Sequence, residues 1–191
     1  MQYVDFHTHH PSREGEIVLQ DGIQTWGIHP WRAHLPYSIP QEPASLFAIG
    51  ECGLDIHSEA TMEIQIKVLK LQLQLAEEWH LPTILHCVKC IDQLILLHKT
   101  VKPAEPWIIH GFRGKPQQLR SLLNTGFYIS FGFRFNQESL LACPTERLLL
   151  ETDEETSPIS LLYQEVAKLR GVSIEMLAKA MQKQYQTLFA K

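Results

Sequence analysis

Short apolar runs alternate with amphipathic stretches along almost the whole chain. The runs are rich in β-branched or aromatic residues, which favours strands, at residues 3–6, 23–28, 46–49, 82–85, 107–109, 127–131 and 147–150. Between them apolar residues recur at helical spacing, most clearly over residues 62–79, where Leu69, Leu73 and Ala76 share one face. Further helices are predicted over residues 91–98, 116–123, 159–170 and 174–188. Strands and helices in alternation are typical of a parallel sheet.

Residues that begin and end helices support these boundaries. Thr61 and Ser173 precede amphipathic stretches and are good N-cap residues, because their hydroxyl oxygens accept from free backbone amides. Gly126 and Gly171 follow amphipathic stretches and are expected to end the helices before them.

The chain of 191 residues is short for a closed ring of eight strand-helix units, which usually takes roughly 200 to 250 residues. After His9, the segment PSREGEIVLQDG has room for a small strand or hairpin around residues 17–19, but not for a helix, a strand and a second helix. An open, doubly wound sheet fits the same alternation, yet groups from most strands meet at one point more readily in a ring. We therefore predict one α/β domain over residues 1–191, a trimmed or distorted TIM-type (β/α) barrel.

Five of the apolar runs end on residues that bind divalent metals. In chain order these residues are His7 and His9, Glu51, His86, His110 and Asp153. A single His at a strand end is often structural, but the carboxyl ends of barrel strands meet at one face, so the ordered set is expected to converge. Imidazole and carboxylate groups can hold a divalent cation and leave a position for water. The pattern favours a metal-dependent hydrolase.

Composition limits the remaining classes of function. The hydrophobic fraction of 45% and charged fraction of 20% are ordinary for a soluble globular protein. We see no apolar run of the roughly 20 residues that a membrane span needs and no signal peptide, so we expect a cytoplasmic protein without a membrane partner. The net charge of −4 argues against a broad basic surface for duplex nucleic acid. No obligate protein partner is indicated.

The four cysteines, Cys52, Cys87, Cys90 and Cys143, are too few for a disulfide framework in a chain of this length, and we expect them to be reduced. Cys87 and Cys90 form a CxxC motif, which leaves a thiol-redox role open. A structural zinc site would need a second such pair.

Six blocks of the sequence together resemble the TatD family of metal-dependent hydrolases, within the amidohydrolase-like barrel group. They are VDFHTHH, GIHPW, IGECGLD, LPTILHC, IIHGFRG and LLLETDEE, and they cover nearly the whole chain in the family's order. The opening DFHTHHPS also resembles the polymerase-and-histidinol-phosphatase-like group, but the GECGLD and ETDEE blocks argue against that group.

The TatD resemblance implies two divalent ions, with zinc, manganese and magnesium all compatible with the ligand types. One ion would be held by His7, His9, Glu51 and Asp153, and the other by Glu51, His86 and His110. Glu51 would bridge the ions and Asp153 would orient the attacking water and accept its proton, which makes both catalytic. Residues two apart on a strand face the same side, so His7 and His9 can bind one ion.

The blocks depart from the family pattern at positions near its substrate. The family's GIHPH ends here in Trp31, its Arg two residues after His86 is replaced by Val88 with Lys89 beside it, and HCFSG is replaced by HGFRG with Arg113. The Pro-Tyr-Leu segment that usually follows Asp153 is also missing. We predict that Lys89 or Arg113 supplies the phosphate contact of the lost Arg, and for each of the two a solvated surface position is the alternative. His29 is expected to face the site as a non-ligand that contacts substrate, or else to act as a structural cap.

We therefore predict a phosphodiesterase or deoxyribonuclease in which two metals activate water, acting on a phosphoester substrate such as DNA ends or single-stranded DNA. One alternative is hydrolysis of a smaller ester or amide at the same metals. Another is a metal-binding barrel without turnover.

Overall fold

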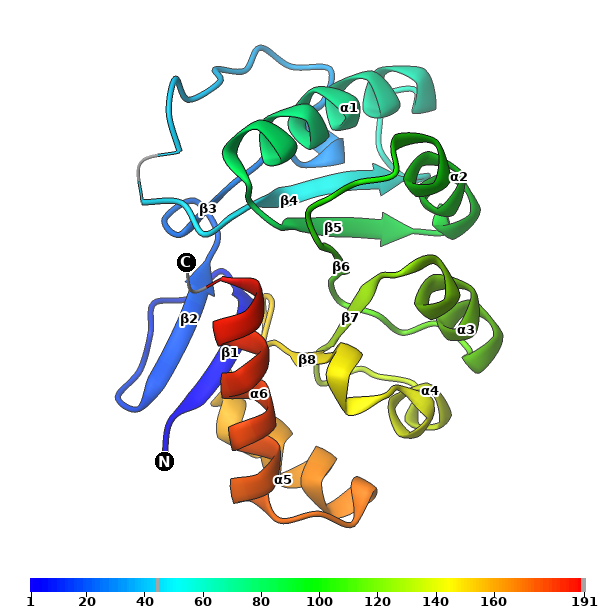
Figure 1. Cartoon of the computed structure of the whole chain (residues 1–191). Coiled ribbons are helices and arrows are strands. Elements are labelled where there is room, and N and C mark those ends of the chain that lie inside the picture. The colour runs from blue at the N-terminus through cyan, green and yellow to red at the C-terminus, as the bar shows by residue number, and fades with distance from the viewer. Residues whose placement is uncertain (44, 190–191) are drawn as a thin grey trace.

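The computed structural model describes residues 1–43 and 45–189, and its strands run in one direction (Figure 1). The strands are β1 Tyr3–Thr8, β2 Glu16–Gln20, β3 Thr25–Trp26, β4 Ala48–Asp55, β5 Thr83–Val88, β6 Trp107–Ile109, β7 Tyr128–Phe131 and β8 Leu148–Leu150. Strands β3 to β8 form one parallel sheet in sequence order, and β1 pairs with β2 in a second, also parallel.

Isolated bridges connect the two sheets at both of their edges. Thr8 pairs with Asp153 just after β8, and Asp21, just after β2, pairs with Thr25 in β3. The eight strands therefore follow one another around a ring. Where β1 meets β8 and where β2 meets β3, the strands are joined by an isolated bridge and not by a continuous ladder of hydrogen bonds. This arrangement confirms the predicted α/β fold of a trimmed, distorted barrel.

The helices lie outside the strands, and five of them were predicted (Figure 1). They are α1 Met62–Trp79, α2 Ile91–Val101, α3 Pro116–Thr125, α5 Ile159–Arg170 and α6 Ile174–Leu188. The predicted caps are confirmed: the Thr61 and Ser173 hydroxyls accept from the amides of Ile64 and Met176, and Gly126 and Gly171 end their helices in the left-handed region. The short helix α4, Gln137–Ala142, was not predicted.

Two strand predictions were wrong in extent. The run at residues 23–28 yields only β3, and just after it the chain passes so close to β4 that a side chain at Gly27 would collide with the backbone of Gly50 and Glu51. Strand β4 runs on to Asp55, beyond the predicted end at residue 49. The register between β4 and β5 shifts between Ile49 and Cys52, so Glu51 lies within an irregular part of the strand and not after its end.

The side of the barrel around β1 and β2 is thin, as predicted, because no helix lies between β1 and β3 in the described chain. Helix α6 packs against β1, with the Phe189 ring 5.9 Å from that of Phe6. Tyr163 of α5 donates its hydroxyl to the Val4 carbonyl at 2.9 Å and accepts from the Val4 amide. The last two helices thereby fix the strand that carries His7.

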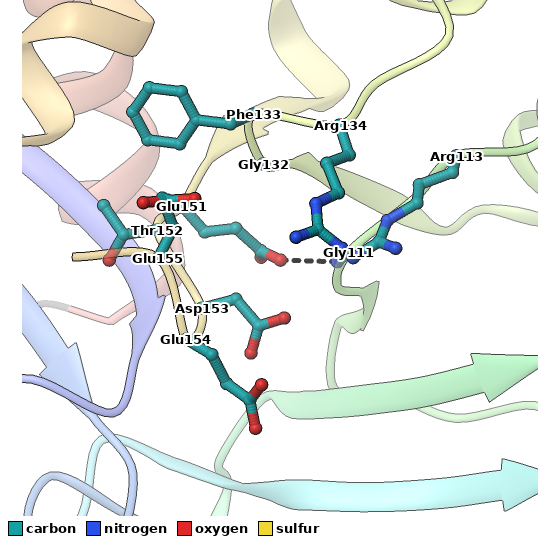
Figure 2. Close-up of a pocket in the computed structure, with 10 residues that line it drawn as sticks. All are labelled: Gly111, Arg113, Gly132, Phe133, Arg134, Glu151, Thr152, Asp153, Glu154 and Glu155. Atoms are coloured by element: carbon teal, nitrogen blue, oxygen red, sulfur yellow. Dashed lines mark hydrogen bonds between the residues drawn. The ribbon is translucent and has the colours of Figure 1, made fainter. Parts of the chain in front are cut away.

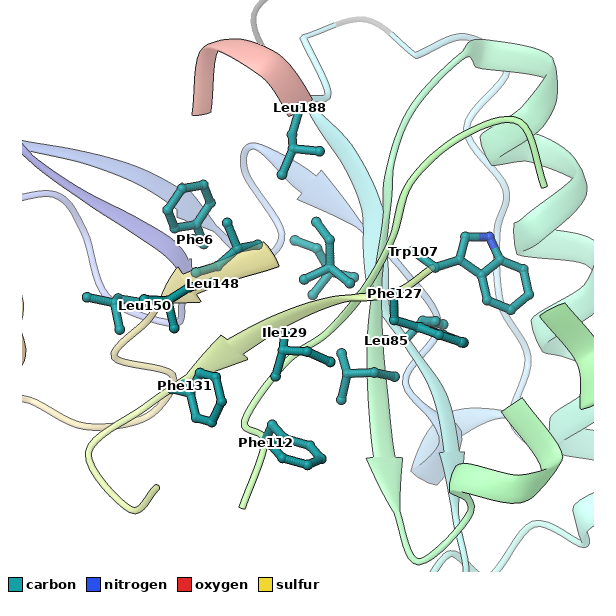
Figure 3. Close-up of a cluster of buried hydrophobic side chains, with 14 of the residues drawn as sticks. Phe6, Leu85, Trp107, Phe112, Phe127, Ile129, Phe131, Leu148, Leu150 and Leu188 are labelled. Carbon is teal, nitrogen blue, oxygen red and sulfur yellow. The ribbon is translucent and has the colours of Figure 1, made fainter. Parts of the chain in front are cut away.

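The core lies among the strands and between the strands and helices. Figure 3 shows aromatic and aliphatic side chains of β1, β5, β7 and β8 meeting in one cluster, including Phe6, Leu85, Ile129 and Leu150, all almost fully buried. Such buried parallel strands read as continuous apolar runs, which is why the sequence pattern located them. Within the described residues we find no helix with the length and apolar character that crossing a membrane requires.

Candidate metal centre

The Glu51 carboxylate lies at the centre of a ring of imidazoles. Its Oε1 atom is 2.6 Å from His86 Nδ1, 2.7 Å from His110 Nε2 and 3.3 Å from His29 Nε2. Its Oε2 atom faces the other side, 3.6 Å from His7 Nε2 and 3.7 Å from His9 Nε2. The structure thus divides the surrounding histidines into two groups, one for each oxygen.

Asp153 completes the group around Oε2. Its Oδ1 atom lies 3.5 Å from His9 Nε2 and 3.8 Å from His7 Nε2. All six residues that the sequence singled out as ligands therefore converge at the end of the barrel where the strands terminate. His7, in β1, and His9, just after the end of that strand, point into the same space, toward Glu51 Oε2.

The backbone around Asp153 is tied firmly to β1. The Asp153 amide donates to the His7 carbonyl and its carbonyl accepts from the His9 amide, both at 3.0 Å. Asp153 has a φ of 57°, in the left-handed region that Asp and Asn adopt more readily than most residues. Next to it, Thr152 donates from its amide and hydroxyl to the buried Asp5 carboxylate at 3.0 and 2.6 Å. The carboxylate of Asp153 is thereby held in place from β1.

A second layer of acids contacts the outward nitrogens of three histidines. His86 Nε2 lies 3.2 Å from Asp55 Oδ2, His110 Nδ1 lies 3.4 Å from Glu151 Oε1, and His9 Nδ1 lies 3.8 Å from Asp21 Oδ2. A carboxylate on one ring nitrogen fixes the tautomer and orientation, and it leaves the other nitrogen basic.

Charge in the site favours ionised carboxylates. Burial alone would raise the pKa of Glu51, but the facing imidazoles, His110 foremost, outweigh it and hold this pKa far below its usual range. Burial also opposes ionisation of Asp153, yet its contact with His9 keeps that pKa below the ordinary value. The same contact and the nearby Glu51 raise the pKa of His9 to about 10. The centre therefore holds ionised carboxylates, and positive charge, as imidazolium or as a bound cation, balances them.

His29 fits both roles that the sequence left open. Its Nδ1 atom accepts from the Trp31 amide at 3.2 Å and caps the 3-10 turn Pro30–Arg32, while its Nε2 atom faces Glu51. The ring is thus held by the turn and presented to the site at the same time.

Lys89 and Arg113 line one cavity of about 650 Å³ together with His86, His110 and Asp153. Trp31 lies on the same cavity, 57% exposed, with its indole nitrogen donating to Asp55 Oδ2 at 2.7 Å. The structure therefore places Lys89 and Arg113, both exposed, beside the candidate metal centre.

The sequence did not distinguish the second layer of acids. Asp21 lies outside the quoted blocks, whereas Asp55 and Glu151 lie inside GECGLD and LLLETDEE. Both of the latter are almost fully buried, and an acid is rarely buried without a partner. An Asp or Glu inside an otherwise apolar strand pattern was the available signal, but only the fold shows which imidazole each acid contacts.

A family model described as TatD related DNase matches residues 16–190 of the chain. The chain belongs to the TatD family. The matched range begins after His7 and His9, so the placement of these two residues rests on the structure. Family membership confirms the resemblance seen in the sequence and places the chain among metal-dependent hydrolases.

Among the relatives, a protein of Pantoea ananatis named 3'-5' ssDNA/RNA exonuclease TatD is 30% identical, over 86% of this chain and 76% of its own length. A protein of Bacillus subtilis named uncharacterized metal-dependent hydrolase YabD is 29% identical, over 74% of this chain and 64% of its own length. The crystal structure of the TatD homologue YjjV of Escherichia coli K12 superposes with a TM-score of 0.78 at 24% identity, covering 94% of this chain and 78% of that one. This last similarity shows the shared fold.

Proposed function

We propose that this TatD family member is a phosphodiesterase that uses two divalent metal ions and acts on the ends of single-stranded nucleic acid. The observation that carries the proposal is the Glu51 carboxylate, whose two oxygens face two separate groups of imidazoles. A carboxylate in this position can bind one cation with each oxygen. The relative from Pantoea ananatis, named an exonuclease on single-stranded DNA and RNA, supports the substrate class.

The residues present fit metal ions. Both ring nitrogens of His7 are buried and have no hydrogen-bond partner in the part of the chain that the structure describes. Such an orphaned imidazole costs free energy unless a ligand completes it. The candidate ligand atoms of His7, His9 and Asp153 lie within 4.8 Å of one another. Glu51 Oε1, His86 Nδ1 and His110 Nε2 lie within 3.3 Å of one another.

In this proposal His7, His9, Glu51 and Asp153 hold one ion, and Glu51, His86 and His110 hold the other. The second-layer acids orient these ligands and raise the basicity of their inner nitrogens. Ions in such a pair lower the pKa of bound water and neutralise the charge that develops on a phosphodiester. The ligand types suit zinc, manganese and magnesium.

The chain's own groups then carry out positioning and proton transfer. The Asp153 carboxylate, kept ionised by its surroundings, orients the attacking water and accepts its proton. Lys89 and Arg113 contact substrate phosphate from the wall of the adjoining cavity, and His29 contacts the substrate or Glu51 through Nε2. A guanidinium binds phosphate in a bidentate manner, whereas an ammonium acts as a point charge.

Hydrolysis of a smaller ester or amide at the same metals is the second candidate, since the loop segment usual after Asp153 is missing. The thiol-redox alternative is disfavoured by the surroundings of the CxxC motif. Burial raises the pKa of Cys87 to about 12 and raises that of Cys90. Redox-active cysteines instead need a stabilised thiolate.

Hydrolysis with and without chelator tests the proposal. The purified protein is expected to cleave a short single-stranded oligonucleotide and bis(4-nitrophenyl) phosphate, to lose both activities in chelator, and to regain them when divalent ions are restored. Activity on 4-nitrophenyl acetate alone would support the smaller-ester candidate. Absence of turnover on all three substrates by the metal-loaded protein would support a barrel that binds metal without catalysis.

Replacing Asp55 by Asn is expected to weaken binding of the ion at His86. Asn keeps the size of the side chain but removes the charge that faces His86 Nε2, and a lost outer partner typically costs about 10 to 100-fold in metal affinity. Competition against a fluorescent chelator measures the effect. Asp92→Asn removes the same charge from the exposed face of α2 and should leave the affinity unchanged. Equal affinities of the two variants would refute the positioning role of Asp55.

A further inference from the structure

Two arginines on neighbouring loops present free guanidinium groups beside Asp153. Arg113 follows β6 and Arg134 follows β7, and Figure 2 shows both side chains reaching toward the same space above Gly111. Within residues 1–43 and 45–189 neither guanidinium has an ion-pair or hydrogen-bond partner. Two unpaired, adjacent cations repel each other, so an anion between them would be stabilising.

The two arginines line a small cavity of about 180 Å³, which we call the arginine pocket, with Phe133, Asp153 and Glu154 among its other residues (Figure 2). Arg113 also lines the larger cavity beside His86 and His110. The arginine pocket therefore adjoins the cavity beside the proposed reaction centre, with which it shares Arg113 and Asp153. Its size suits one small charged group better than a whole nucleotide.

Three of the four acids that line the arginine pocket are engaged with other groups. Glu151 accepts from the Gly111 amide at 2.5 Å and faces His110, and Glu155 accepts from the Ser157 hydroxyl at 3.1 Å. Asp153 faces His7 and His9. These three carboxylates thus have partners, the fourth, Glu154, is exposed, and both guanidiniums remain available.

We propose that Arg113 and Arg134 together bind a substrate phosphate other than the one that is cleaved. This inference rests on the proposed function, because it assumes a substrate with a second phosphate next to the reacting one. Arg is the residue best suited to this task, since its planar fork donates two parallel hydrogen bonds to phosphate oxygens. The bound phosphate would be a terminal phosphomonoester or the neighbouring phosphodiester of the strand. Either would place the scissile bond at the metal centre and favour nucleic acid over a small neutral ester.

Binding of labelled single-stranded oligonucleotides in chelator tests the inference without any need for turnover. Fluorescence anisotropy would compare wild type, Arg134→Ala and Arg134→Lys across a series of salt concentrations. Arg120→Ala, which removes a charge from the exposed surface of α3, is the matched control. Arg134→Ala should weaken binding about tenfold at low salt and reduce the slope of log affinity against log salt by about 0.7, the value for one lost contact with a single strand. Arg134→Lys should restore most of the slope, and the control should change neither.

Oligonucleotides with and without a terminal phosphate show whether the bound phosphate is a terminal phosphomonoester or a phosphodiester of the backbone. If Arg134→Ala loses affinity only for the strand with the terminal phosphate, the bound group is the terminal phosphomonoester. If it loses affinity equally for both strands, the bound group is a backbone phosphate. If Arg134→Ala and Arg120→Ala bind equally well, the inference is wrong.

Steady-state kinetics of the metal-loaded protein add a second readout. Arg134→Ala is expected to raise KM about tenfold for the oligonucleotide, with a much smaller effect on bis(4-nitrophenyl) phosphate, which has only one phosphate. An equal loss of kcat on both substrates would place Arg134 at the cleaved phosphate and overturn the inference. If Arg134→Ala reduces the salt slope of binding as expected but the wild type cleaves nothing, the proposed function fails while the phosphate site stands.

Discussion

Glu51→Gln is expected to release both metal ions and to reduce phosphodiester hydrolysis by roughly 10³-fold or more, about 4 kcal/mol in the activation barrier. Glu51 is the residue whose carboxylate oxygens face both groups of imidazoles. Gln retains the shape but has one neutral oxygen and an amide that repels cations. Metal content by mass spectrometry and turnover of bis(4-nitrophenyl) phosphate measure the effect.

Lys89→Ala is the comparison for Glu51→Gln. Lys89 lines the cavity beside the candidate metal centre and is proposed to contact substrate, so its loss should mainly raise KM and leave the metal content normal. Thermal unfolding of both variants checks that the fold survives, because Glu51 is buried. Normal metal content and turnover in Glu51→Gln would show that the carboxylate does not bridge.

Asp153→Asn is expected to retain the fold and at least one ion and to slow hydrolysis by about 10² to 10⁴-fold, the usual contribution of a general base. Asn tolerates the left-handed backbone at this position, and its amide oxygen can still bind a cation, but it cannot accept a proton from water. Single-turnover cleavage of a short single-stranded oligonucleotide and of a small phosphodiester, at matched metal occupancy, isolates this step.

Glu165→Gln is the matched control, because it neutralises an exposed acid on α5 that lines neither the metal centre nor the arginine pocket. It should cleave both substrates nearly as fast as wild type. Equal rates for wild type and Asp153→Asn would instead show that Asp153 is a structural acid at the end of β8.

Most of the fold could be predicted because buried parallel strands are apolar along their length. The runs that became β5, β6, β7 and β8 carry little other than core side chains. Prediction failed for β4, where the polar residues and glycines of ECGLD interrupt the apolar pattern. There Glu51 and Asp55 are buried by partners from other strands and from Trp31, and sequence-local patterns do not contain those partners.

The convergence of the candidate ligands could be predicted because five of the six, all but Glu51, lie at or near the end of a strand. The roles of Asp21, Asp55, Glu151 and Arg134 could not be predicted, because each depends on a contact with a residue from another part of the chain. Glu151 acts on His110, 41 positions earlier, and Arg134 matters only because the ends of β6 and β7 bring it beside Arg113. Sequence patterns identify residue types, whereas these pairings follow from the order of the strands.

Counting the ions bound to the wild-type chain is the most direct test of the central claim, that Glu51 joins two metal sites. Native mass spectrometry, with the metal-free protein titrated with zinc or manganese, is expected to show two ions per chain in wild type and at most one, bound weakly, in Glu51→Gln. A wild-type chain that takes up only one ion at saturation, or none, would contradict the account.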